Sequence, residues 1–244
     1  NYDVYYLSGY VKAFQIHGDG NPQLLFYENN GLRAIYVYMK RETFISGIYD
    51  SITPYGYGGV LFEGDISTEK LNAFWNDYVQ KMNEENIIDN FVRYHPMILN
   101  AIPMKEISNV IDLGKTIAMD LSSPEIIWEN IHSKNRNMIR KAEKNGIEIH
   151  HGKGLDLLDK FIVIYNATMD KDNADKYYYF SQSFYESIHN DLYDNYEIFY
   201  QVSKILFLIR YSLWTYHSNF SANYRRCHPG YGLFTRKWSI PRGA

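Results

Sequence analysis

The sequence predicts an α/β fold with a mixed sheet, in which strands and helices alternate along the chain. Apolar runs of strand length alternate with longer segments whose apolar residues recur at helical spacing. An Asn-Gly pair, the strongest short-range signal for a hairpin, separates the apolar runs 24–27 and 32–38. Hydrophobic residues make up 45% of the 244 residues, which is enough for a core and argues against a disordered chain.

The first half of the chain is expected to continue from this hairpin into a loop, a helix and a strand. The loop is rich in glycine and tyrosine and covers 53–59. Ser67 or Thr68 caps the following helix, whose apolar stripe predicts one buried face. The stripe comprises Leu71, Phe74, Trp75, Tyr78, Val79 and Met82. A strand is predicted over 90–94, ending before Pro96, because a proline restricts the residue that precedes it.

A second unit is expected to start near residue 115 with a strand over 116–121. The run 122–125 marks a helix start, with a serine cap, a proline in the first turn and an acid near the positive end of the dipole. Asn145-Gly146 marks the end of that helix. The later elements are expected in this order: strand 147–150, helix 155–169, helix 180–192, strand 196–200 and strand 205–214.

Cysteine usage and hydropathy indicate where the protein works. Cys227 is the only cysteine, so no disulfide can form within the chain, which favours a reducing, cytoplasmic location. No N-terminal segment resembles a signal peptide, and the apolar run 205–209 is too short to span a bilayer. We therefore expect a soluble cytoplasmic protein without a transmembrane segment. Because the chain begins at Asn1 without a methionine, we also expect a fragment of a longer product.

Charge is distributed unevenly along the chain. The net charge of -3 argues against a protein covered by nucleic acid or by anionic membrane. No acidic residue follows Glu197, whereas the last 47 residues contain seven lysines and arginines. This stretch is interpreted either as a basic tail for an anionic partner or as something other than the original end of the domain.

The segment 133–146 predicts a strongly basic helix. Arg136, Arg140 and Lys144 are spaced at i, i+4 and i+8, and Lys141 extends the same side, so these cations share one face. Arginine's planar fork matches a phosphate in bidentate fashion, so the face is a candidate phosphate site. The alternative is a solvated surface whose cations complement the helix dipole. The opposite face is apolar and is expected to pack; it comprises Ile127, Ile131, Met138 and Ala142.

The loop Pro54–Gly59 is a second candidate site. Gly56, Gly58 and Gly59 tolerate positive φ and let the backbone approach a ligand, and Tyr55 and Tyr57 supply hydroxyls and ring faces. The spacing fits neither a dinucleotide fingerprint nor a P-loop. The alternative is a tight turn whose tyrosines pack on their neighbours.

Other chemistry is sparse in this sequence. His150 and His151 are adjacent on a predicted strand, so they point to opposite faces, and no metal site is expected. No Ser-His-Asp constellation can be picked out, and Cys227 lacks the local signature of a nucleophile. No catalytic residue is therefore nominated.

Taken together, the glycine-tyrosine loop, the predicted strand 116–121 and the helix ending in Arg-Lys-Ala-Glu-Lys-Asn-Gly resemble FemAB-type proteins, a branch of the GNAT acyltransferase superfamily. The resemblance covers roughly residues 2–200. It implies tandem GNAT-like domains, with a first domain over 1–114, an incomplete second domain over 115–226 and an atypical tail over 227–244.

The resemblance also implies acyl or aminoacyl transfer to an amine acceptor. In the peptidoglycan branch the donor is aminoacyl-tRNA and the acceptor is a phosphate-containing cell-wall precursor, which can be lipid-linked; in acetyltransferase-like branches the donor is an acyl-CoA. The donor is a co-substrate, so no bound cofactor is expected. By this resemblance Arg136, Arg140, Lys141 and Lys144 would hold phosphates. The acceptor cleft between the domains would be shaped by Tyr55, Gly56, Tyr57, Gly58 and Gly59.

The sequence also departs from the family pattern. The segment 155–177 leaves no room for the helical arm of the staphylococcal-type members, and the resemblance stops at Cys227. An alternative function is therefore a catalytically inactive or truncated remnant that binds a phosphate ligand. A third hypothesis is an RNA-binding protein that uses the basic tail, with Tyr224 and Trp238 as stacking platforms, although the acidic balance of the chain argues against it.

Overall fold

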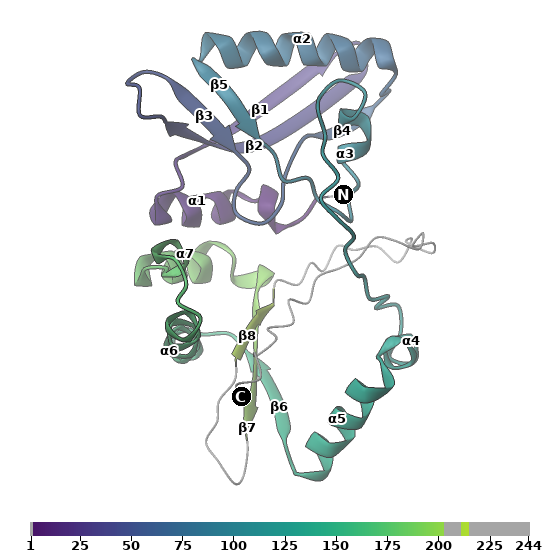
Figure 1. The fold of residues 1–244 in the computed structure, drawn as a ribbon, viewed down its shortest axis with the longest axis vertical. Helices are drawn as coiled ribbons and strands as arrows, with labels where there is room; N and C mark the ends of the chain where they lie inside the picture. The colour runs from purple at the N-terminus through teal and green to yellow at the C-terminus, as the bar shows by residue number, and fades with distance from the viewer. Residues whose placement is uncertain (1, 203–210, 215–244) are drawn as a thin grey trace.

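The computed structural model describes residues 2–202 and 211–214, and these form a mixed α/β structure (Figure 1). One unit, at the top of Figure 1, contains a five-stranded sheet between two helices. A second unit below it contains a three-stranded sheet and the remaining long helices. Of the predicted strand 205–214, the part 211–214 is described and is a strand, whereas 205–210 and the tail 227–244 lie outside the described residues.

The sheet of the first unit is built around one long strand, β2 (Leu32–Glu42). Its neighbours are β1 (Asn21–Asn29) on one edge and, on the other, both β3 (Tyr49–Ile52) and β4 (Leu61–Gly64). All three pair with β2 antiparallel, whereas β5 (Ile87–Phe91) pairs with β3 in parallel. Since β3 pairs with 39–42 and β4 with 32–35, the two strands diverge along this edge, and the glycine-tyrosine loop connects them.

The predicted hairpin is confirmed, and its turn follows from two residues. Asn30 and Gly31 both have positive φ, 46° and 79°, as a two-residue turn of the mirror-image type requires. The turn sets the register in which Asn29 pairs with Leu32. Alternation along β2 then divides the core: Ala34, Tyr36 and Tyr38 face one helix, and Val37 and Met39 face the other.

Helices α1 (Ser8–His17) and α2 (Thr68–Glu84) cover the two faces of this sheet (Figure 1). The amphipathic stripe predicted for α2 is confirmed at Leu71, Phe74, Tyr78 and Met82, which are buried, but not at Val79, which is exposed. The chain also has a short 3-10 helix, η1 (Val4–Tyr6), before α1 and a short helix, α3 (Ala101–Met104), after β5. The strand predicted over 90–94 is shifted, since β5 starts at Ile87 and ends at Phe91.

The second unit consists of short strands and helices. Its strands β6 (Glu148–Gly152), β7 (Glu197–Val202) and β8 (Tyr211–Trp214) form an antiparallel sheet in that order. Its helices and 3-10 turns are α4 (Pro124–Asn130), α5 (Ser133–Lys144), α6 (Leu155–Lys171), η2 (Lys176–Tyr178), α7 (Gln182–Asp191) and η3 (Tyr193–Asn195). The predictions for α6 and α7 are confirmed.

Two predictions for the second unit are wrong. The segment 116–121 forms no strand and pairs with none of the described strands; Ile117 is 86% exposed. The predicted continuous helix ending at Asn145 is broken at Ile131, whose ψ of 127° is extended. The break divides it into α4, capped by Ser123 Oγ, and α5, where the His132 ring accepts a hydrogen bond from the Lys134 backbone N–H.

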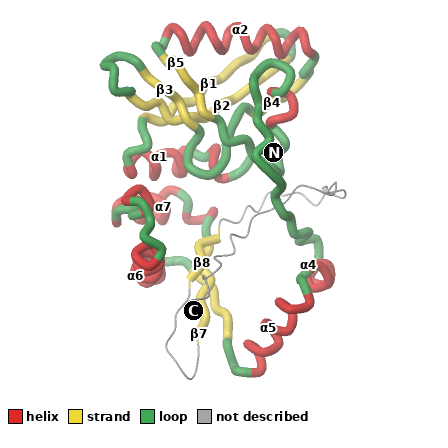
Figure 2. Tube along the Cα trace, viewed as in Figure 1, coloured by secondary structure: helices red, strands yellow, loops and turns green. Residues whose placement is uncertain are grey.

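The two units share one hydrophobic core, in which α1 packs on α7 (Figure 2). Gly9 lets the helices approach, because a Cβ there would lie 2.8 Å from Asp191 Cβ. One turn further, Lys12 Nζ pairs with Asp191 Oδ2 at 2.8 Å. The tandem GNAT-like organisation and the boundaries at 114 and 226 stay predictions. None of the helices in the described residues is both long and apolar enough to cross a membrane.

Candidate functional site

A cavity of about 460 Å³ lies at the junction of the two units. The first unit contributes residues from η1, α1 and the glycine-tyrosine loop, and the second contributes α6, α7 and the segments that flank them. Its wall is mostly aromatic. The lining residues are Val4, Tyr5, Tyr10, Phe14, Tyr55, Phe161, Tyr165, Met169, Asp172, Ala174, Tyr178, Phe180, Phe184, Tyr185, Ile188, Leu192, Asn195 and Tyr196.

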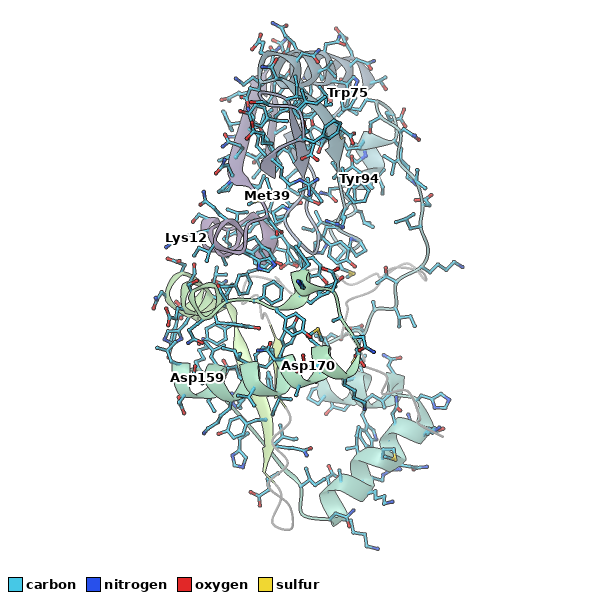
Figure 3. All side chains as sticks on the ribbon, turned by 60° about the vertical axis from the view of Figure 1, so that its left-hand side comes forward. Lys12, Met39, Trp75, Tyr94, Asp159 and Asp170 are labelled. Atoms are coloured by element: carbon cyan, nitrogen blue, oxygen red, sulfur yellow. The ribbon has the colours of Figure 1, made fainter. Side chains whose placement is uncertain are left out.

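Ring packing across the junction holds this wall together. Phe184 of α7 meets Phe14 of α1 edge to face at 5.2 Å, and Phe180 stacks on Phe184 at 4.4 Å. Such aromatic pairs stabilise the folded chain beyond what the burial of their apolar surface alone contributes. Figure 3 shows ring side chains in the layer between α1, where Lys12 is labelled, and α6, where Asp159 and Asp170 are labelled. The junction is therefore a packed interface with a partly open cavity.

The glycine-tyrosine loop reaches this junction. Tyr55 lines the cavity, and its backbone carbonyl accepts a hydrogen bond from the Tyr10 hydroxyl at 2.6 Å. Tyr57 does not line the cavity; its ring packs against the rings of Tyr5 and His95, with centroid distances of 5.8 and 5.4 Å. Only the first of the two tyrosines is thus part of the cavity wall.

The three glycines of the loop are required by the packing of the folded chain. Gly56 has φ of 103° and Gly59 has φ of 98°, a region that side chains other than glycine rarely adopt. A Cβ at Gly56 would collide with the Tyr5 ring, and one at Gly59 would lie 2.8 Å from the Tyr94 ring. At Gly58 a Cβ would lie 2.9 Å from Thr53. Dense packing therefore explains these glycines without a ligand.

Asn100 anchors the loop, a role that sequence reasoning missed. Its side chain is buried; Nδ2 donates to the Gly58 carbonyl at 2.8 Å, and Oδ1 accepts from the His95 backbone N–H at 3.0 Å. The His95 ring extends this network to the N-terminal segment. Its Nδ1 accepts from the Met97 N–H at 3.1 Å, so the proton sits on Nε2, which donates to Asp3 Oδ2 at 3.0 Å.

A polar cluster lies beside Tyr55, and sequence reasoning missed this as well. The Tyr177 hydroxyl donates to Asp19 Oδ2 at 2.8 Å, and His17 Nε2 donates to the Tyr177 carbonyl at 2.8 Å. Partial burial raises the pKa of the Asp19 carboxyl, against the opposing effects of the Tyr177 hydrogen bond and of nearby cations that include Arg93. The Tyr55 and Tyr177 rings are 6.0 Å apart, so the cluster adjoins the cavity wall.

The basic helix α5 stands apart from this junction, at the lower right of Figure 1. The Arg136 guanidinium caps α4, since Nη1 donates to the carbonyls of Trp128, Glu129 and Ile131 at 3.3, 3.1 and 2.6 Å. Arg140 lies over the Trp128 ring at 5.3 Å.

The packing predicted for the apolar face of α5 is wrong, because no residue of α5 is buried among the described residues and Met138 is 61% exposed. Lys141 and Lys144 are exposed. The structure therefore does not bring the four predicted cations together with the glycine-tyrosine loop.

The model of the FemAB family matches residues 82–205, just over half of the chain, including the basic helix and Asn100 but not the glycine-tyrosine loop. A search of curated proteins finds no match to this chain. On the strength of the family match, the chain belongs to the FemAB family.

Proposed function

We propose that this chain transfers an acyl or aminoacyl group to an amine acceptor, as an N-acyltransferase of the FemAB type. The observation that carries the proposal is the family match, because FemAB membership associates a chain with aminoacyl transfer in the synthesis of peptidoglycan bridges. The donor would be an aminoacyl-tRNA or an acyl-CoA, and the acceptor a phosphate-containing, lipid-linked cell-wall precursor. Both donors are made inside the cell, so we place the reaction in the cytoplasm.

The reaction requires that the amine and the donor carbonyl be held close together and that a group accept the proton of the amine; it requires no covalent enzyme intermediate. The acceptor amine attacks the carbonyl carbon of the donor ester or thioester, an amide bond forms, and the bond to the tRNA oxygen or CoA sulfur breaks. The amine must lose a proton on the way, and the leaving group must gain one. Asp19 suits this relay, because it is a half-buried carboxylate at the junction with a raised pKa.

The exposed cations of α5 are the proposed contacts for the phosphates of the precursor or donor. Arg140, Lys141 and Lys144 are exposed and form no ion pair with a carboxylate among residues 2–202. Arg136 belongs to the same proposal, and its guanidinium also holds the α4–α5 corner. Tyr55, with Gly56, Tyr57, Gly58 and Gly59, would shape the acceptor side of the junction.

The experiment measures binding and turnover separately. The full chain is titrated calorimetrically with acetyl-CoA, with a charged tRNA and with a UDP-linked muropeptide, and each donor–acceptor pair is then assayed for the amide product by mass spectrometry. The Lys141→Ala/Lys144→Ala variant should weaken muropeptide binding several-fold, whereas Lys160→Ala, an exposed lysine on α6, should not. Asp19→Asn should keep binding and lose turnover.

Three outcomes are informative. Turnover that depends on Asp19 supports the proposal as a whole. Muropeptide binding without turnover from any donor would instead support the phosphate-binding remnant. If none of the three ligands binds, the proposal is refuted.

A further inference from the structure

Strand β1 is a long edge of the five-stranded sheet. It has nine residues, and within the described part of the chain only β2 pairs with it. An edge strand presents a row of unpaired N–H and C=O groups that can pair with another strand, and natural edges are usually short or carry charges that prevent this. Glu28 is the only charged residue of β1. The edge is therefore open to pairing.

The hairpin turn decides which backbone groups of β1 face outward. In a two-residue turn the flanking residues bond to each other, so the backbone groups of Asn29 and Leu32 face one another. The far side of β2 agrees with this pattern, because the Asp65 N–H donates to the Gly31 carbonyl at 3.3 Å. Alternation then leaves four residues of β1 with backbone groups directed away from β2: Pro22, Leu24, Phe26 and Glu28.

The side chains at the centre of this edge are apolar and exposed. Leu24 is 64% exposed and Phe26 is 61% exposed. Both lie on the face of the sheet that α1 covers in part, since Leu24 is opposite Val37, which belongs to the core beneath α1. A strand added to this edge would bury both side chains and bond the outward backbone groups of the same two residues.

We propose that two copies of this chain associate through their β1 edges, which pair antiparallel about a twofold axis at Leu25. In this register Leu24 lies opposite Phe26 of the second copy, and the pair occurs twice. Each of these pairs exchanges two backbone hydrogen bonds, and Glu28 donates to the Pro22 carbonyl of the second copy. Roughly six hydrogen bonds join the two sheets into one.

A second copy suits this edge better than an unrelated strand, because the sequence of β1 is complementary to itself. The four exposed apolar side chains gather at the centre of the pairing, where cross-strand apolar pairs stabilise a sheet. Pro22, which lacks an N–H, falls at the ends, where one missing donor matters least. The two Glu28 side chains also lie at opposite ends, so no like charges oppose each other. On the other face Leu25 meets its own copy, beside a hollow of about 380 Å³ between β1 and α2.

The expected dimer is weak. A single pair of strands buries less than the roughly 1,200 Å² of a standard interface, which is typical of transient association in the micromolar range. Neither Leu24 nor Phe26 lines the junction cavity, so the association does not rest on the proposed transferase reaction.

Sedimentation velocity of the full chain at about 1–200 μM tests the association, since this range spans a micromolar dissociation constant. We expect a shift from monomer to dimer and no larger species, because isologous pairing uses up the edge. A chain that stays monomeric throughout leaves the edge to another occupant and overturns the proposal.

Two double variants test the register. Leu24→Lys/Phe26→Lys sets lysine opposite lysine across the twofold axis, whereas Leu24→Lys/Phe26→Glu sets lysine opposite glutamate and removes the same apolar surface. The dissociation constant of the first should exceed that of the second by about tenfold or more. Equal dissociation constants overturn the proposal.

Two single variants test the edge itself. Leu24→Pro removes one outward N–H and leaves the pairing of β1 with β2 intact, so it should abolish the dimer. Ile88→Lys is the matched control, because Ile88 is an exposed apolar residue on β5, at the opposite end of the sheet, and its replacement should change nothing. Thermal unfolding checks that each variant folds, and the double variants decide if Leu24→Pro does not. A dimer that survives in folded Leu24→Pro overturns the proposal.

Discussion

Removal of the Asn100 side chain should release the glycine-tyrosine loop and destabilise the chain. In Asn100→Ala the buried Gly58 carbonyl loses the donor at 2.8 Å, and the His95 N–H loses the acceptor at 3.0 Å. Each buried backbone group left without a partner costs about 1–3 kcal/mol. For the two groups together we therefore expect a loss of about 2–6 kcal/mol in the free energy of unfolding, toward the lower end if water reaches one of the groups.

Urea unfolding followed by circular dichroism measures this loss. With a slope of about 2 kcal/mol per molar urea, a loss of 3 kcal/mol lowers the midpoint by about 1.5 M. Asn76→Ala is the matched control, because Asn76 is exposed on α2 and its replacement should change stability by less than about 0.5 kcal/mol. Limited proteolysis should also cut the variant within 54–59. If Asn100→Ala unfolds at the same urea concentration as the control, the loop does not depend on this amide.

Three further predictions concern the junction and its loop. Gly56→Ala should destabilise the chain by about 1–3 kcal/mol in the same urea assay, because it combines a positive φ with a collision at the Tyr5 ring; unchanged stability would show that the loop rearranges freely. Phe184→Ala should lower the free energy of unfolding by about 3–5 kcal/mol, as other truncations of buried aromatic residues do. A calorimetric scan in which the two units of the variant still melt together at the original temperature would contradict this. Hydrogen bonds from Lys12 and Ser187 lower the pKa of Asp191, so its stabilising effect is present above the ordinary carboxyl pKa and is lost as the pH falls through the lowered value. Urea midpoints measured across acidic pH should therefore fall less steeply for Asp191→Asn than for the unmodified chain, and parallel curves would refute the assignment.

The elements that could be predicted from the sequence are those whose signals are local. Asn30-Gly31 fixes a turn by its own backbone preferences, and the hairpin follows. The apolar spacing of Leu71, Phe74 and Tyr78 predicts the buried face of α2, although Ser67 at its N-cap makes no side-chain capping hydrogen bond. Ser181 Oγ caps α7 by accepting the Phe184 N–H at 3.3 Å. In each case the residues that decide the structure lie within a few positions of one another, where propensity and capping rules apply.

The candidate site could be predicted only in part, because its contacts join distant parts of the chain. Tyr177 and Asp19 are separated by 158 positions, and Asn100 and Gly58 by 42. No periodicity or motif links such pairs in one sequence. The glycine-tyrosine loop was identified because its composition is unusual, whereas Asn100 resembles any other asparagine until the fold places it against the loop.

The segment 116–121 shows a different error: its sequence has the local pattern of a strand, but the segment does not form one. Its apolar residues have the spacing of a strand, but a strand needs a neighbour to pair with, and Ile117 and Leu121 remain 86% and 45% exposed. Helix α5 is similar, since its apolar face was predicted from periodicity but Met138 is exposed. Amphipathic spacing identifies the face of a helix or strand that can be buried. Whether that face is buried depends on another element packing against it.

Arg136 shows why the basic helix must be tested through other residues first. Its guanidinium donates to three carbonyls at the end of α4, so Arg136→Ala would leave those carbonyls without this cap and loosen the α4–α5 corner. A loss of phosphate affinity in that variant could then arise from misplacement of α5 rather than from the missing charge. Lys141 and Lys144 are exposed on α5 itself, so their replacement removes charge while this corner keeps its contacts. If the double lysine variant binds the muropeptide normally, Lys141 and Lys144 are not phosphate contacts, whatever the effect of Arg136→Ala.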